Sequence, residues 1–206
     1  MKKTILFALI SAFVFSMSIS AQVNEKEVKK LAKKEAKTLK KEGWQVAPGA
    51  LPLQVQLENA YRKQLDTDEL GQPKFFIGAA QPISQTFDAA KIQAQSLANF
   101  DIAQKTQTQL KGIIENAVGN KQLSPEEAAS IEQMTMKSTE LISGKLGRTT
   151  PIMECFKTLP NGNTQIMIRI AYPTSRALEE AKEAVRQELE KELKELSEKL
   201  ERVSVK

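Results

Sequence analysis

The chain has 206 residues, and its 30 basic and 25 acidic side chains leave a formal charge of +5. Without Lys2 and Lys3, which belong to a predicted N-terminal signal, the charge is about +3, too balanced to favour a nucleic-acid partner. Histidine is absent, which excludes Ser-His-Asp and Cys-His catalysis and disfavours zinc or copper sites. The single cysteine excludes an internal disulfide, so stability must come from packing.

Residues 1–21 have the three-part pattern of a cleaved secretory signal. Two lysines precede an apolar run over 5–15, and small residues follow up to Ala21. The run is shorter than the roughly 20 residues that cross a bilayer, and no second run follows, so we expect no membrane-spanning segment. We predict cleavage near Gln22 and export to the periplasm or the extracellular space, an address compatible with outer-membrane association.

Residues 22–43 predict a basic helical arm. Eight lysines and four glutamates lie between positions 24 and 42, and the apolar residues fall on one narrow helical face. We expect this helix to dock on the body of the protein or on a partner, with membrane-surface binding as the less favoured alternative because the face lacks bulky anchors. The candidates for steering a partner by charge are Lys30, Lys34 and Lys41.

Residues 44–173 predict an α+β domain, a small antiparallel sheet packed by long helices. We expect a short helix over 53–66, a strand over 74–80, and a long helix from a cap at Ser84 to Val118. Gly78 would let another element approach the strand closely. Alanines at intervals of four residues would let the long helix approach a sheet: Ala90, Ala94 and Ala98.

The second half of this domain predicts one further helix and a β-hairpin. Ser124 and Glu127 form a capping box that starts a helix reaching Gly144. The hairpin joins 148–158 to 164–172, and strict alternation in its second strand predicts one buried face and one partly wet face. We interpret Cys155 as a buried, inert thiol, with an intermolecular disulfide as the alternative if its strand lies at an edge.

Residues 174–206 predict a projecting charged segment. Its helix, capped by Thr174 or Ser175 and ending at about Arg202, would be about 43 Å long at 1.5 Å per residue. Leu193, Leu196 and Leu200 form a short coiled-coil-like seam and are candidates for binding a protein partner or a second copy. Residues 178–202 hold nine glutamates against six basic residues. We therefore expect the basic first helix to pack against this acidic last helix, within one molecule or between two copies.

The chain lacks the motifs of common cofactor and metal sites. Neither a phosphate-binding loop nor a dinucleotide fingerprint is present. The acidic patch over 66–69 lacks the remaining positions of a calcium loop. We expect no cofactor, no metal and no catalytic residue.

The order of elements over 75–172 resembles the roughly 20-kDa bacterial envelope lipoproteins of the surface-antigen type. The similar features are an aromatic strand ending in small residues at 76–80, the alanine spacing that leads to Ile102, and the hydrophobic strands over 152–156 and 166–172. They cover about half of the mature chain. The resemblance implies an α+β envelope domain without known catalytic residues. The chain departs from that family by lacking the lipid-bearing cysteine.

Together these observations predict a non-enzymatic, exported cell-envelope protein that acts as a structural or protein-interaction module. One alternative is a periplasmic chaperone that holds unfolded clients with basic helical arms. Another is a glycan hydrolase that uses carboxylates, since 25 acidic side chains are available.

Overall fold

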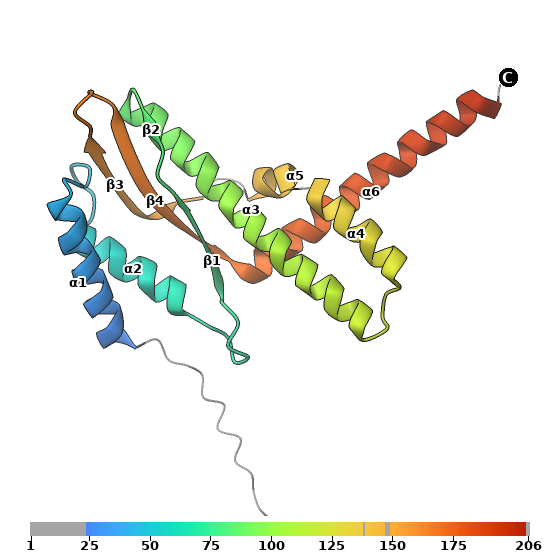
Figure 1. Ribbon diagram of the computed structural model, residues 1–206, viewed down its shortest axis with the longest axis horizontal. Coiled ribbons are helices and arrows are strands. Elements are labelled where there is room, and N and C mark those ends of the chain that lie inside the picture. Colours follow the sequence, from blue (N-terminus) through green and yellow to red (C-terminus); the bar gives the residue numbers. More distant parts are fainter. Residues whose placement is uncertain (1–23, 138, 147–148, 205–206) are drawn as a thin grey trace, which may run out of the picture.

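A computed structural model describes residues 24–137, 139–146 and 149–204. This part of the chain forms an elongated α+β structure, with a small sheet at one end and packed helices at the other (Figure 1). Its elements are α1 (Glu25–Lys41), α2 (Leu53–Leu65), β1 (Phe75–Ala80), β2 (Ile83–Ser84), α3 (Phe87–Gly119), α4 (Pro125–Lys137), α5 (Thr139–Lys145), β3 (Pro151–Thr158), β4 (Thr164–Pro173) and α6 (Thr174–Ser204). The predicted signal over 1–21 lies outside the described residues. None of the described helices combines the length and apolar character needed to cross a bilayer.

The long strand β4 is the centre of the antiparallel sheet. It pairs with β3 through the predicted hairpin, and it pairs with both β1 and β2. Between those two short strands, the carbonyl of Pro82 accepts a hydrogen bond from the backbone N–H of Ile166 at 3.1 Å. β1 and β2 therefore act as one strand that is interrupted near Pro82, since proline has no N–H to donate to a ladder.

One face of the sheet packs against the first half of α3. The alternating residues of β4 on this face are buried, as predicted, and the alanines of α3 face them: Ile166, Ile168, Ile170, Tyr172, Ala90, Ala94 and Ala98. Gly78 is where the helix comes closest, because a Cβ built there would lie 2.2 Å from the carbonyl oxygen of Ala98. The predicted close approach is confirmed.

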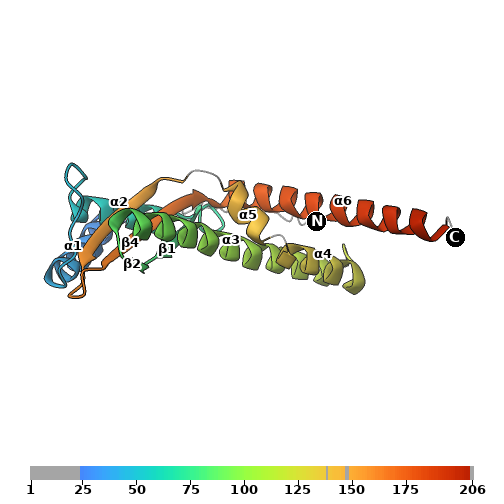
Figure 2. The ribbon, with the colours of Figure 1, turned by 90° about the horizontal axis from the view of Figure 1, so that it is seen from above.

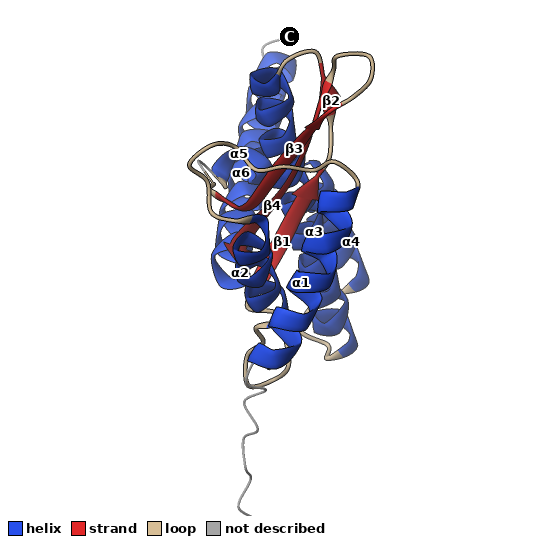
Figure 3. Ribbon diagram, turned by 90° about the vertical axis from the view of Figure 1, so that its left-hand side faces the viewer, coloured by secondary structure: helices blue, strands red, loops and turns tan. Residues whose placement is uncertain are grey.

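The other face is packed by α2, with α1 beside it, and the β4 residues on this face are only half-buried, so the partly wet face expected from the alternation is confirmed. Residues from both helices, from their connection and from β3 form a second buried cluster: Ala32, Ala36, Leu39, Trp44, Leu53, Leu57, Ala60, Met153 and Cys155. The basic helix predicted over 22–43 forms as α1 and belongs to this layer. The sheet is thus enclosed between α3 and the α1–α2 pair (Figure 3).

Both outer edges of the sheet are partly occupied by hydrogen bonds. At β1, a carboxylate oxygen of Asp101 accepts from the backbone N–H of Ala79 at 3.0 Å. At β3, Gln45 exchanges two backbone hydrogen bonds with Phe156, at 2.9 and 2.8 Å. Filled edge positions leave fewer backbone groups to pair with a strand of another chain.

The second half of α3 continues beyond the sheet and packs with α4, α5 and the first half of α6. The predicted capping box is confirmed, since the N–H of Glu127 donates to the Ser124 hydroxyl and the Ser124 N–H donates to the Glu127 carboxylate. The helix expected up to Gly144 is described as two segments, α4 and α5, on either side of Ser138, which lies outside the described residues. The end of α6 extends past its neighbours (Figure 2).

The cap predicted for the long helix is displaced by two residues. Ser84 belongs to β2, where it pairs with Thr164. The hydroxyl of Thr86 accepts from the backbone N–H of Ala89 at 3.2 Å and caps α3 instead. Strand pairing with β4 keeps Ser84 extended, so the helix begins only after that pairing ends.

The expected packing of the first helix against the last within one molecule is wrong. α1 packs on α2, whereas α6 packs on α3, α4 and α5 at the opposite end of the molecule (Figure 1). The apolar face of α1 gains more from burial against the sheet layer than from attraction between net charges, which salt screens beyond about 10 Å. Pairing between two copies stays a prediction.

Candidate functional site

The outer side of α1 is a strongly basic surface. We call it the lysine face, and it consists of Lys26, Lys29, Lys30, Lys33, Lys34, Lys37, Lys40 and Lys41, all of them exposed. At 3.6 residues per turn these eight residues fall within an arc of about 140°. The buried residues of α1 lie on the opposite side of the helix, so burying one side presents all the lysines together.

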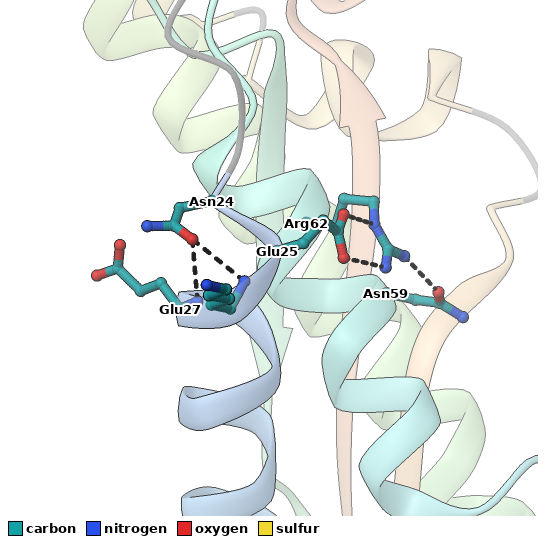
Figure 4. A network of polar contacts seen from close by, with 6 residues as sticks. Asn24, Glu25, Glu27, Asn59 and Arg62 are labelled. Carbon is teal, nitrogen blue, oxygen red and sulfur yellow. Dashed lines mark hydrogen bonds and ion pairs between the residues drawn. The ribbon is translucent and has the colours of Figure 1, made fainter.

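The beginning of α1 is held by hydrogen bonds that involve none of these lysine side chains (Figure 4). The Asn24 side chain caps the helix by accepting from the backbone N–H groups of Lys26 and Glu27. The Glu25 carboxylate receives two hydrogen bonds from Arg62 of α2, at 2.8 and 3.1 Å. That pair lowers the pKa of Glu25, chiefly through the hydrogen bond from Arg62.

The middle of α1 is fixed to the sheet through Glu35, which is mostly buried. Its carboxylate accepts a hydrogen bond from the Tyr61 hydroxyl at 2.6 Å and forms an ion pair with Arg169 of β4. Burial, followed by this hydrogen bond, raises the pKa of Tyr61. Because an ion pair broken on one side leaves an uncompensated charge, these contacts hold the orientation of α1.

The lysine face keeps an excess of positive charge, with eight lysines against four glutamates between positions 24 and 42. Two of the four glutamates between positions 24 and 42 are engaged by Arg62 and Arg169. None of the eight lysines forms an ion pair with a described residue. A row of ammonium groups on a low-dielectric body creates a positive potential that attracts anions.

The face is hollowed where α1 meets α2. A groove of about 440 Å³ is lined by Lys33, Lys37, Lys40 and Lys41, with Ala36 and Gln54 beside them. By contrast, a groove of about 300 Å³ between α3 and α4 contains Lys111 and Glu132, and one of about 390 Å³ at the edge of β3 contains the ion-paired Lys91 and Glu154. Only the α1 groove, among these three, has charges of a single sign.

The structure separates the predicted site residues into two groups. Lys30 and Lys34 lie on the lysine face, and Lys41 lies in the groove. Leu193, Leu196 and Leu200 belong to α6, but their side chains lie outside the described part of the chain, and their helix is at the other end of the molecule. Sequence reasoning missed the other five members of the face, which a projection of the helix at 100° per residue would have added: Lys26, Lys29, Lys33, Lys37 and Lys40.

Other groups that could carry chemistry are occupied. Cys155 is fully buried, which confirms the predicted burial of this thiol, and burial raises its pKa to about 12. In the acidic patch, Asp66 pairs with Lys74 at 3.0 Å, and Asp68 accepts backbone hydrogen bonds from Leu70 and Gln72. Across the described ranges, no three His, Cys, Asp or Glu side chains converge as metal ligands would.

Comparisons of the chain with protein-family models, curated proteins and solved structures found no match. The resemblance to envelope lipoproteins stays a prediction, and the lysine face rests on its own geometry.

Proposed function

We propose that this protein is an exported, non-enzymatic module of the cell envelope that binds an acidic partner through the lysine face of α1. The observation that carries the proposal is the row of eight exposed lysines without an ion pair to a described residue. Such a row costs electrostatic repulsion, and an acidic partner would relieve it. Complementary charge mainly increases the association rate and selects against basic partners.

The packing of α1 supports a binding surface that exists before the partner arrives. Val28 and Ala32 are fully buried, and Glu25 and Glu35 tie the helix to α2 and β4. The helix therefore loses little conformational entropy on binding, whereas a free basic segment would have to become ordered. The apolar side of α1 is buried in the core, so the partner would bind the exposed side through electrostatic attraction.

A crosslinking and fractionation experiment in intact cells tests this function. Reversing the three candidates named from sequence, Lys30→Glu, Lys34→Glu and Lys41→Glu together, should abolish the salt-sensitive association that the wild type shows with the envelope. A matched variant, Lys111→Glu, Lys121→Glu and Lys182→Glu, changes the net charge equally. Its three positions lie on α3, in the α3–α4 connection and on α6, in that order.

The matched variant should fractionate like the wild type at every salt concentration. Equal retention and equal crosslinks for the wild type and the α1 variant would contradict the proposal. Loss of association in both variants would assign the effect to net charge and would equally contradict a specific surface. Circular dichroism should show the same helical content for all three proteins.

A further inference from the structure

We infer that the acidic partner is a linear acidic polysaccharide, which lies lengthwise along α1 with its carboxylate, sulfate or phosphate groups on the lysine face. This inference rests on the function proposed above and names the chemistry of its partner. It follows from the shape of the charged surface, the kind of basic residue, and the single sign of the charged side chains that line the groove.

The lysines are arranged as a line of charge. From Lys26 to Lys41 the face extends about 22 Å at 1.5 Å per residue, and every helical turn of about 5.4 Å contributes at least one ammonium group. The groove between α1 and Gln54 of α2 follows the second half of this line. A chain that repeats one anionic group per unit can meet several of these charges at once, whereas a small anion would meet only a few.

The residue types indicate a surface that recognises the density of negative charge on a polymer and does not recognise a particular sugar ring. All basic residues between positions 24 and 42 are lysines, whose ammonium groups act as mobile point charges and lack the planar fork of arginine. The residues that line the groove include no aromatic side chain. Trp44, close to the end of α1, is buried in the core and leaves no ring to stack on a sugar.

An anionic membrane is the competing surface, and the packing of α1 disfavours it. A helix that binds in the membrane interface inserts its apolar face among the lipid chains. Here Val28 on that face is buried, and Ala32, Ala36 and Leu39 pack in one cluster with residues of α2 and β3. Only the charged side of α1 remains exposed. A groove in that side can enclose a linear polymer, whereas a flat membrane surface would not enter it.

Binding of the processed protein to polygalacturonate, a linear polymer with a carboxylate on each sugar, tests the inference. Neutral dextran of similar length should not bind. If four lysines each neutralise one anionic group, raising the salt from about 50 to about 200 mM should weaken binding about 50-fold, with the slope of about 0.7 per contact that holds for single-stranded nucleic acids. More contacts would make the dependence on salt steeper. Tighter binding to phosphatidylglycerol vesicles than to polygalacturonate at equal anionic charge would overturn the inference in favour of a membrane.

Three variants locate the polymer on the molecule. Changing Lys33, Lys37, Lys40 and Lys41 to Gln removes the groove charges while keeping good helix formers, and should lower the slope of log affinity against log salt by about 3. Changing Lys26, Lys29, Lys30 and Lys34 to Gln should weaken binding comparably if the polymer lies lengthwise. A control in which Lys111, Lys121, Lys182 and Lys191 become Gln has the same net charge and should bind like the wild type.

The outcomes separate this inference from the proposed function. If the groove variant and the control bind polygalacturonate equally, the inference is wrong. If binding is unchanged when the first four lysines are replaced, lengthwise binding is wrong. If polygalacturonate does not bind but the α1 charge reversal still abolishes envelope association in cells, the proposed function stands and the polysaccharide is refuted as its partner.

Discussion

Gly78→Ala should destabilise the protein because α3 lies directly over this glycine. The added Cβ would lie 2.2 Å from the Ala98 carbonyl oxygen and 2.7 Å from Cγ1 of Ile102. An ordinary contact begins near 3.4 Å, so the helix must move away from β1 by about 1 Å. Overpacking costs about 1–3 kcal/mol, and we expect the upper end because the obstacle is backbone that cannot change rotamer.

For a chain of this size, about 3 kcal/mol corresponds to a fall in melting temperature of about 6–12 °C. Denaturant unfolding gives the free energy directly, and Gly112→Ala is the matched control. Gly112 lies inside the same helix with no atom within 4 Å of an added Cβ. This change should stabilise the protein by about 0.5–1 kcal/mol. If Gly78→Ala matches or exceeds the wild type in stability, the close packing of α3 on β1 is refuted.

Three further predictions concern titration, capping and processing. Burial, then a hydrogen bond to Glu180, raises the pKa of Tyr172 to about 12, and the pKa of Tyr61 is also raised. Ultraviolet absorbance should therefore show that neither tyrosine of the folded protein ionises near pH 10. Because folding raises these pKa values, the two neutral tyrosines contribute fully to the free energy of unfolding below pH 10, and this contribution should disappear as the pH rises towards 12. A melting temperature that stays constant between pH 10 and 12 would contradict this. Ser124→Ala should cost about 1 kcal/mol in denaturant unfolding and Ser124→Asp much less, because Asp also caps helices. Mass spectrometry of the exported protein should find an N-terminus near Gln22, and retention of residues 1–21 would refute the signal.

Local patterns in the sequence predict most helices and strands. The alternation that ends at Tyr172 predicts a strand with one buried face, and the capping box at Ser124 predicts the start of α4. These signals involve residues that are close together in the sequence, so they can be recognised without knowledge of the fold. The cap at Ser84 failed because pairing with Thr164, far along the chain, outweighs a local preference.

The candidate site divides in the same way. The clustering of lysines on one side of α1 follows from helical periodicity and was partly predicted through Lys30, Lys34 and Lys41. The groove could not be predicted, because it depends on where α2 lies beside α1. The same is true of the neutralised Glu35, whose partner Arg169 is 134 residues away.

The sequence by itself therefore determined the α+β class and the amphipathic character of α1, because both depend on the spacing of neighbouring residues. Tertiary structure decided which helices enclose the sheet and which charges on α1 remain unpaired. Burial of apolar faces is non-directional, so an amphipathic helix can pack on any apolar surface of suitable shape. Its final position depends on long-range contacts such as the pair between Glu35 and Arg169, which form only when the chain has folded.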